Sequence, residues 1–301
     1  MMKLPAALAA LCLAAPVLAQ PLDPTPRIAV VSAFAPEWTT LQKAMTVSAD
    51  HEINGSRYLV GTLGDRPVVL FLSGVSMVNA AMNTQLVIDR FAIEGIVFSG
   101  IAGGVDPGLD VGDVIVPEAW SQYLESVFAR EVGDGYVLPP SMPPAPLQNY
   151  GMIFPQPVGV TSDRQDGVEQ RLWFPADAGY LAVAREVAGS LDLAACNAAN
   201  ACLDKPPRIL VGGNGVSGAA FVDNAAFREW VDATFAARVL DMESAAVAHV
   251  AYANDVPFIA FRSLSDLAGG GEGANEMETF MSLAADNSAA VVIAFLEALP
   301  D

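Results

Sequence analysis

The sequence predicts an α/β domain, in which apolar strands alternate with helices around a central sheet. The first observation is a strand, a helix and a strand in succession over residues 238–266. The second is the same alternation earlier in the chain, where an apolar run at 28–34 precedes a helical segment at 38–45. The third is the hydrophobic content of 53%, which is ample for one large core. This alternation is typical of helices packed on both faces of a mostly parallel sheet.

Some antiparallel pairing is expected beside the parallel strands. The runs 58–63 and 68–72 are separated by Gly64-Asp65, a dipeptide that favours a tight turn. The other expected elements are a helix at 77–91, a strand at 95–98 that ends in the glycine-rich segment 99–104, strands at 113–116 and 208–212, and helices at 225–236 and 276–299.

The segment 238–266 carries the first candidate site. Two strands joined by one helix are expected to lie parallel, because such connections are right-handed crossovers. Glu243 and Asp266 would then lie at the carboxyl ends of parallel strands, where open α/β sheets bind their ligands. Either acid alone could be a helix cap or a loop residue. The pair, placed together by the topology, favours a functional site.

The first nineteen residues resemble a signal peptide. Lys3 supplies the positive end, residues 4–13 the apolar run, and 17–19 a small-residue cleavage site. The run is broken by proline and is too short for a membrane anchor, and no later segment is judged long and apolar enough to span a bilayer. We therefore expect residues 20–301 to form a single exported domain, periplasmic or secreted.

Composition excludes several kinds of partner. The formal net charge of −19 argues against binding to nucleic acids or to anionic membranes. Cys196 and Cys202 lie close together in a polar segment, so a disulfide is expected in an oxidising compartment. His51 and His249 are too far apart in sequence to give a metal-binding pattern, and neither a metal nor another cofactor is predicted.

Residues 119–178 interrupt the alternation. The segment is rich in proline and in aromatic residues, and its aromatic content argues against simple disorder. A connection of this length without regular structure is usually functional or mobile. We interpret it as an insertion that covers the site or packs on a second subunit.

Five sequence blocks, taken in order, resemble those of the purine nucleoside phosphorylase/5′-methylthioadenosine nucleosidase superfamily. The resemblance extends from residue 28 to the C-terminus and is interrupted by the insertion. The blocks are SAFAPE (32–37), SGVS (73–76), SGIAGG (99–104) with LDVGDVIV (109–116), LDMESA (240–245) and RSLSD (262–266).

The resemblance implies a three-layer fold with a central mixed, partly barrel-like sheet, and a homo-oligomer, dimeric or larger. It also implies cleavage of the N-glycosidic bond of a purine nucleoside. By similarity, Asp266 protonates the purine at N7, Glu243 accepts hydrogen bonds from the ribose hydroxyls, and Glu37 activates water. The transition state resembles a ribosyl cation leaving a purine anion, which is why a proton donor and a base are both required.

The same resemblance assigns the remaining substrate contacts. Met242 would pack on the sugar and Phe221 would stack on the base, while the backbone of Val222 would read the purine edge. Gly100 and Ser265 complete the predicted substrate-binding set. Where relatives have SGDAF, this chain has SGAAF at 217–221, so one carboxylate is missing from the base-binding segment.

Water is favoured over phosphate as the nucleophile. A phosphorylase must hold a phosphate dianion, usually with Arg or with backbone donors. The loops that follow Leu72 and Phe98 contain no Arg or Lys, and Glu37 would repel phosphate. A phosphate-dependent phosphorylase remains the main alternative, and a non-catalytic nucleoside-binding or uptake protein remains open.

Overall fold

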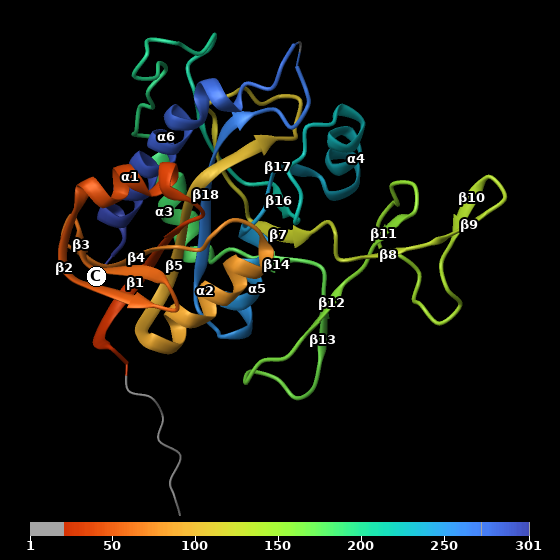
Figure 1. Cartoon of the computed structure of the whole chain (residues 1–301), viewed down its shortest axis with the longest axis horizontal. Helices are drawn as coiled ribbons and strands as arrows, with labels where there is room; N and C mark the ends of the chain where they lie inside the picture. The colour runs from red at the N-terminus through yellow and green to blue at the C-terminus, as the bar shows by residue number, and fades with distance from the viewer. Residues whose placement is uncertain (1–20, 272, 301) are drawn as a thin grey trace, which may run out of the picture.

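The computed structural model describes residues 21–271 and 273–300, so the predicted signal peptide lies outside the described residues. A twelve-stranded mixed sheet forms the centre of the molecule (Figure 1). Its main path runs β14-β7-β16-β17-β5-β1-β4-β3-β2, and β18, β6 and β15 branch from β5. The strands are β1 (Asp23–Ser32), β2 (Met45–Ile53), β3 (Ser56–Leu63), β4 (Arg66–Leu72), β5 (Phe91–Gly104), β6 (Val114–Val116), β7 (Ala119–Gln122), β14 (Phe174–Pro175), β15 (Ile209–Val211), β16 (Asn214–Ser217), β17 (Ala237–Asp241) and β18 (Phe258–Asp266).

Helices cover both faces of the sheet, as predicted. Successive residues of β5 enter different cores: Phe98 joins the cluster that includes α2 and α5 residues, and Val97 joins the cluster on the α1, α3 and α6 side. This alternation follows from the two-residue period of a strand. The predicted three-layer α/β fold is therefore confirmed. The helices are α1 (Ala35–Ala44), α2 (Met77–Arg90), α3 (Ala178–Ala188), α4 (Ala225–Phe235), α5 (Ser244–Ala253) and α6 (Met277–Ala298).

Strand β5 organises the sheet. It was expected to end at residue 98, but it continues through the glycine-rich segment to Gly104. Strand β1 pairs with its first part and β18 pairs with it as far as Gly103, both in parallel. Strand β17 pairs with Gly103 and Gly104, beyond the last residue that pairs with β1. The glycine-rich segment expected to follow the strand therefore belongs to it: Gly100 pairs with β18, and Gly103 pairs with both β17 and β18.

The predicted parallel arrangement of β17 and β18 is also wrong. Strand β17 is antiparallel to β5, whereas β18 is parallel to it. The two strands therefore approach the end of β5 from different directions. Asp266 and Leu240 are both in register with Gly103, so the ends of the two strands still meet there. The expected convergence is observed, although the topology that produces it differs.

The antiparallel pairing predicted near the N-terminus is confirmed. Strands β3 and β4 form a hairpin that turns at Gly64. Strand β2, which was not predicted, pairs with β3 at the sheet edge. Most of the side chains of β2 are polar and exposed or half-buried, so the apolar alternation that identifies a strand is weak there.

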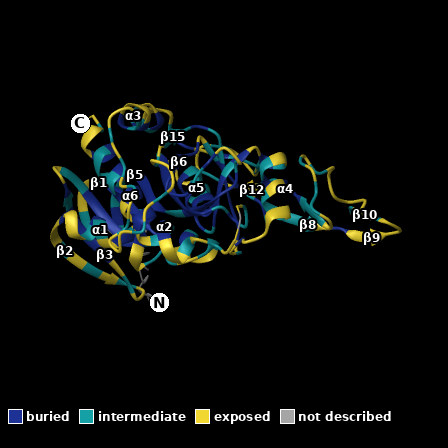
Figure 2. Cartoon of the chain, turned by 90° about the horizontal axis from the view of Figure 1, so that it is seen from above, coloured by how far each residue is buried: buried dark blue, intermediate teal, exposed yellow. Residues whose placement is uncertain are grey.

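The segment 119–178 contains short strands, although no regular structure was predicted for it. Its two ends, β7 and β14, belong to the central sheet. Residues 125–172, which we call the arm, project from the body and hold three small two-stranded sheets (Figures 1 and 2). The strands of the arm are β8 (Ser126–Phe128), β9 (Arg130–Val132), β10 (Gly135–Val137), β11 (Ile153–Pro155), β12 (Val158–Val160) and β13 (Glu169–Arg171).

Contacts near α4 and near the end of α5 help to attach the arm to the body. Near α4, Tyr150 packs on Trp230 with ring centroids 5.4 Å apart, and the Trp230 indole N–H donates to the carbonyl of Gln148 at 3.0 Å. Near the end of α5, the Tyr252 ring lies between the guanidinium groups of Arg164 and Arg171, at 4.5 and 4.1 Å from the ring centroid. Aromatic and cation–π contacts therefore hold the base of the arm.

Helix α6 is long and apolar enough to span a membrane by length and composition alone, which the sequence analysis did not expect. In the structure most of its apolar residues are buried, and the helix packs on α1, β5 and β18. Buried helices of globular proteins have the same composition. Among the described residues, α6 is the helix that meets this criterion.

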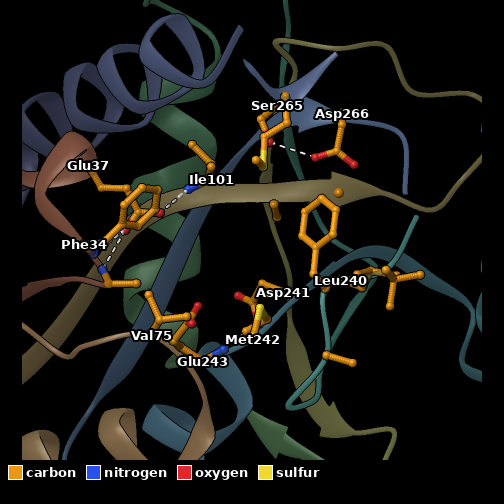
Figure 3. Close-up of a pocket in the computed structure, with 17 residues that line it drawn as sticks. Phe34, Glu37, Val75, Ile101, Leu240, Asp241, Met242, Glu243, Ser265 and Asp266 are labelled. Atoms are coloured by element: carbon orange, nitrogen blue, oxygen red, sulfur yellow. Dashed lines mark hydrogen bonds between the residues drawn. The ribbon is translucent and has the colours of Figure 1, made fainter. Parts of the chain in front are cut away.

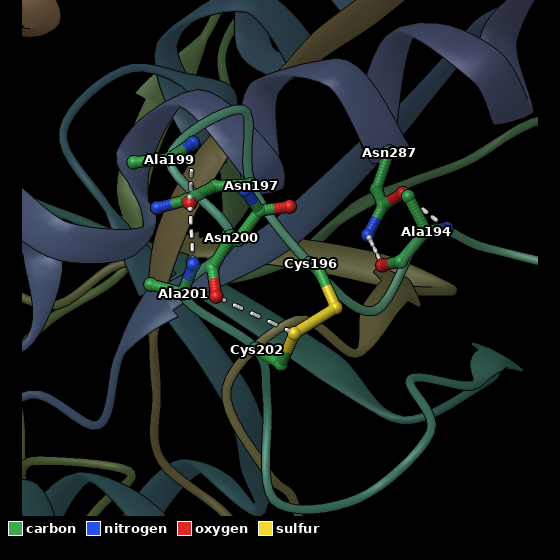
Figure 4. The surroundings of a disulfide bond; sticks show 8 residues. All are labelled: Ala194, Cys196, Asn197, Ala199, Asn200, Ala201, Cys202 and Asn287. Carbon is green, nitrogen blue, oxygen red and sulfur yellow. Dashed lines mark hydrogen bonds between the residues drawn. A yellow bond between two sulfur atoms is a disulfide. The ribbon is translucent and has the colours of Figure 1, made fainter.

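The predicted disulfide between Cys196 and Cys202 is present (Figure 4). The loop that it closes contacts α6, and so does Ala194 just before it. The Asn197 carboxamide donates to the carbonyl of Thr279 at 2.9 Å, and the Asn287 carboxamide exchanges two hydrogen bonds with the backbone of Ala194. The loop therefore fastens the first half of α6 to the body.

Candidate active site

A pocket opens where β5, β17 and β18 end (Figure 3). Glu37 enters from α1, Glu243 from the start of α5 and Asp266 from the end of β18, so three carboxylates surround the pocket from three sides. The other lining residues are mostly apolar. They are Ala33, Phe34, Val75, Ile101, Ala102, Gly103, Ala220, Phe221, Val222, Leu240, Asp241, Met242, Ser265 and Met277.

Arg262 lies beneath the pocket and has no exposed surface. Its Nε is 2.7 Å from Oδ2 of Asp241, and its Nη1 and Nη2 are 3.7 and 3.6 Å from the carboxylates of Glu37 and Glu243. The guanidinium also lies 3.8 Å from the centroid of the Phe98 ring. One buried cation thus compensates three buried carboxylates, which would otherwise repel one another.

The Glu37 carboxylate is held from several directions. Oε2 accepts a hydrogen bond from the backbone N–H of Ala33 at 2.6 Å, and Oε1 accepts one from Ile101 at 2.8 Å. Burial raises the pKa of Glu37, and the nearby Arg262 and these N–H groups act in the opposite direction. The carboxylate is therefore a stronger base than an exposed glutamate, and its orientation is fixed.

The Glu243 carboxylate is the second buried acid of the pocket. Its Oε1 accepts a hydrogen bond from the backbone N–H of Ser76 at 2.7 Å. Burial raises the pKa of Glu243 to about 7; Arg262 opposes this shift and the charge of Asp241 adds to it. Near neutral pH the group is therefore close to the change between its neutral and ionised forms.

The Asp266 carboxylate accepts two local hydrogen bonds. The Ala268 backbone N–H donates to Oδ1 at 2.8 Å, and the Ser265 hydroxyl donates to Oδ2 at 2.9 Å (Figure 3). Burial nevertheless raises the pKa of Asp266, and these hydrogen bonds oppose the shift. A raised pKa favours the neutral carboxyl, which is the form that can donate a proton.

Asp241 supports this arrangement from below. Its carboxylate accepts hydrogen bonds from the Ser217 hydroxyl and from the backbone N–H groups of Glu243 and Ser244. It therefore holds the turn from β17 into α5, which carries Glu243. Asp241 and Arg262 belong to two of the recognised sequence blocks, but neither was predicted to have a role in the site.

Most of the predicted site residues line one pocket. Glu37, Glu243, Asp266 and the rest of the predicted set meet there, with Gly100 as the exception. Gly100 lies behind the lining, where an added Cβ would be 2.0 Å from Nη1 of Arg262 and 2.6 Å from Oε1 of Glu37. Gly100 therefore makes room for the buried ion pair and does not itself face the pocket.

Several lining residues were missed by sequence reasoning. Met277 comes from the start of α6 and Phe34 from the turn before α1, and both add apolar surface. Phe34 belongs to a quoted motif, so that motif could have indicated it. Met277 has no comparable signal, because only the packing of α6 brings it to the pocket. Among the described residues, those that line the pocket all lie outside 119–178, so the arm does not cover it.

This fold and pocket define an α/β protein with a small-molecule site of carboxylates and apolar side chains at its strand ends. The chain belongs to the phosphorylase superfamily, whose family model matches residues 27–297. The family expected from the sequence blocks is therefore confirmed.

The curated relatives that are similar to this chain include two 5′-methylthioadenosine/S-adenosylhomocysteine nucleosidases. The protein from Listeria monocytogenes serotype 4b (strain CLIP80459) is 30% identical over 273 residues, which cover 90% of this chain and 99% of the relative. The protein from Tolumonas auensis is 28% identical over 274 residues, which cover 91% of this chain and 100% of the relative.

Solved structures show the same fold. A mutant Helicobacter pylori 5′-methylthioadenosine nucleosidase with 5′-methylthioadenosine in its active site matches with a TM-score of 0.69 and 20% identity, over 91% of this chain and 99% of the other. Futalosine hydrolase from Helicobacter pylori matches with a TM-score of 0.67 and 20% identity, over 91% and 98%. Proteins named for different substrates therefore share this architecture.

Proposed function

We propose that this protein is a purine nucleosidase, which uses water to split the N-glycosidic bond of an adenosine-type or 5′-substituted purine nucleoside. The observation that carries the proposal is the convergence of Glu37, Glu243 and Asp266 on one largely apolar pocket. The hydrolytic class of the curated relatives agrees with this enzyme class.

In the proposed reaction, Asp266 acts as the general acid and Glu37 as the general base. Asp266 donates a proton to N7 of the purine as the C1′–N9 bond breaks, and the bonding electrons pass to the base. Glu37 accepts a proton from water as the water oxygen bonds to C1′. The products are a free sugar and a neutral purine, and solvent carries the proton from Glu37 back to Asp266. Glu243 accepts hydrogen bonds from the ribose hydroxyls, and Met242 packs on the sugar.

Phe221 and Val222 supply the base-binding wall. Phe221 is 57% exposed and lies at the mouth of the pocket, where its ring can stack on a bound purine. Val222 is buried, so its backbone is held in place beside the pocket. Ala219 stands where the resembled family has a carboxylate, so the nucleosides to be tested should differ in base and in 5′ substituent.

The electrostatics of the pocket favour hydrolysis over phosphorolysis. No Arg or Lys is found among the described residues that line the pocket. Arg262 is fully buried and already faces the carboxylates of Glu37, Asp241 and Glu243. A phosphate beside Glu37 would meet a repulsion on the order of 4 kcal/mol, at about 4 Å and an effective dielectric near 20.

The test is product analysis with a panel of purine nucleosides, with and without phosphate. We expect free sugar at equal rates in both conditions. Asp266→Asn should lower turnover by about 10²- to 10⁴-fold, and Glu37→Gln should bind nucleoside normally but hydrolyse it slowly. Sugar 1-phosphate formed only with phosphate present would establish the phosphorylase alternative. Tight binding without any turnover would establish a nucleoside-binding protein.

We propose further that the protein is exported and self-associates. The basis for export is the signal-like sequence at 1–19, together with the Cys196–Cys202 disulfide. Self-association is supported by apolar side chains on the arm, among them Phe128 and Val132, which are 59% and 55% exposed. Fractionation of the cells that make the protein would test the first proposal, and sedimentation of the pure protein would test the second.

A further inference from the structure

Ser76 has a backbone conformation that residues other than glycine rarely adopt. Its φ and ψ are 79° and 161°, in a region that is essentially restricted to glycine because an L side chain is crowded there. Among the described residues, the other non-glycine residues with a positive φ have values between 47° and 61°. Ser76 therefore stores conformational strain, and strain of this kind is concentrated at sites where it serves a function.

Hydrogen bonds hold the strained residue in place. Ser76 ends the segment 73–76, which joins β4 to α2, and each carbonyl of that segment accepts a hydrogen bond. The donors are Nδ2 of Asn83 to Ser73, the Ser73 hydroxyl to Gly74, Nδ2 of Asn79 to Val75 and the backbone N–H of Ala80 to Ser76. The Ser73 N–H also donates to the carbonyl of Ser32, at the end of β1, at 2.8 Å. A strained conformation persists only where its surroundings fix it in this way.

The N–H that this conformation presents is bonded to Glu243. The distance from the Ser76 nitrogen to Oε1 is 2.7 Å, and Glu243 is buried. Among the described residues, no other N–H or O–H group donates to this carboxylate. Nη2 of Arg262 is 3.6 Å from Oε2, which is too far for a hydrogen bond, so it attracts the carboxylate without fixing its orientation. The orientation of the Glu243 carboxylate therefore depends on the Ser76 N–H.

We propose that Ser76 is a positioning residue for Glu243: its strained backbone directs an N–H at one carboxylate oxygen and so orients the acceptor of the ribose hydroxyls. This inference rests on the proposed function, because it assumes that Glu243 accepts those hydrogen bonds. A carboxylate has about four acceptor sites, so one bond to Ser76 leaves acceptors for two hydroxyls. A main-chain N–H that is held in place orients the carboxylate before the substrate arrives, so less freedom is lost on binding.

The direct test removes only the N–H group. Incorporation of glyceric acid, the α-hydroxy analogue of serine, at position 76 by nonsense suppression replaces the Ser76 N–H with an ester oxygen and keeps the side chain. We expect kcat/KM for a purine ribonucleoside to fall by about 10- to 100-fold, which corresponds to the loss of a hydrogen bond to a charged group. The 2′,3′-dideoxynucleoside of the same base should show no such fall, because it offers Glu243 no hydroxyl.

The matched control places an ester at Val78, two residues further along the chain. The Val78 N–H lies in the first turn of α2, where backbone N–H groups have no partner within the helix. Val78 is also 80% exposed. The Val78 ester should therefore leave kcat/KM at the wild-type value for both substrates.

Ordinary substitutions test the strain. Ser76→Gly keeps the N–H and adopts the same conformation without crowding, so the melting temperature should rise by about 2–4 °C. Ser141→Gly, in an exposed turn of the arm where φ is not positive, should lower it slightly, because glycine is freer in the unfolded chain. Ser76→Val cannot hold the strained conformation, because its side chain is branched at Cβ. Its kcat/KM for the ribonucleoside should be at least about 10-fold below that of Ser76→Gly.

The outcomes separate this inference from the proposed function. An ester at position 76 that lowers kcat/KM equally for the two substrates, or for neither, would overturn the inference, and so would a Ser76→Gly variant no more stable than Ser141→Gly. If the ester variant does not fold, the comparison of Ser76→Gly with Ser76→Val on the two substrates decides in the same way. If calorimetry shows that the ester weakens binding of the ribonucleoside alone, but the wild type cleaves neither substrate, the inference stands and the proposed function fails. A wild-type protein that neither binds nor cleaves nucleosides would overturn both.

Discussion

The body and the arm of this molecule use similar residues in different ways. In the body, Phe98 and Phe261 are fully buried, and even Arg262 has no exposed surface. In the arm, Phe128 and Val137 are more than half exposed, on strands of three residues. Figure 2 shows the change from a buried centre to an exposed extension. The body is built to exclude water from a site, whereas the arm presents apolar surface to its surroundings.

The ion pairs of the two regions differ in the same way. Arg262 and the three carboxylates that it faces are buried, and removal of this single cation leaves buried negative charges uncompensated. Arg164 at the base of the arm pairs with Asp255 at 2.7 Å, but both side chains are exposed. Exposed pairs contribute little to stability. An arginine–carboxylate ion pair therefore matters greatly for the stability of the body and contributes little to the stability of the arm.

The largest expected effect comes from Arg262→Met. Removing this cation leaves Glu37, Asp241 and Glu243 buried beside one another, and we expect a loss of about 3–5 kcal/mol in the free energy of unfolding. Urea unfolding at pH 8 measures it. The matched variant Arg164→Met should lose no more than about 1 kcal/mol. Equal losses in the two variants would contradict the contrast between body and arm.

A smaller effect is expected from Glu243→Gln, and it depends on pH. The pKa of Glu243 in the folded protein is about 7, above its ordinary value of 4.5. Between these two values the folded state binds more protons than the unfolded state, so stability falls as pH rises through this window. The variant should be more stable than the wild type by about 3 kcal/mol at pH 8, and equal to it near pH 4. A constant difference between pH 4 and pH 8 would exclude this explanation.

The smallest effect on the body is expected from shortening the arm. Residues 130–137 form the β9–β10 hairpin, whose ends are paired at Arg130 and Val137. Replacing them with two glycines leaves the Tyr150 and Trp230 contact intact. Turnover per site should be unchanged, and the free energy of unfolding should change by less than about 0.5 kcal/mol. Sedimentation should show weaker self-association, and loss of turnover in the monomer would show that the arm serves the site.

Elements of the body with a clear apolar period could be predicted from the sequence. Apolar runs with clear periods predicted β1, β4 and α2, because burial on the sheet imposes those periods. Glu37, Glu243 and Asp266 were expected to meet because strand ends and family motifs placed them together. Their convergence in one pocket agrees with that expectation.

Other features depend on partners that are distant in sequence. The glycines at 99–104 have the local composition of a turn, yet β17 and β18 pair with them and extend β5. Met277 reaches the pocket only because α6 packs on the sheet. The short strands of the arm have too few residues for any period to be recognised.

The central position of β5 has a consequence for how the chain acquires its structure. One edge of β5 pairs with β1, near the N-terminus, and the other with β18, about 160 residues later in the chain. Helix α6, which packs on β5 and β18, is the last element to be synthesised. Contacts this distant in sequence make folding slow, and synthesis proceeds from the N-terminus. A nascent chain would therefore lack its complete core until α6 has been synthesised and can pack on β5 and β18.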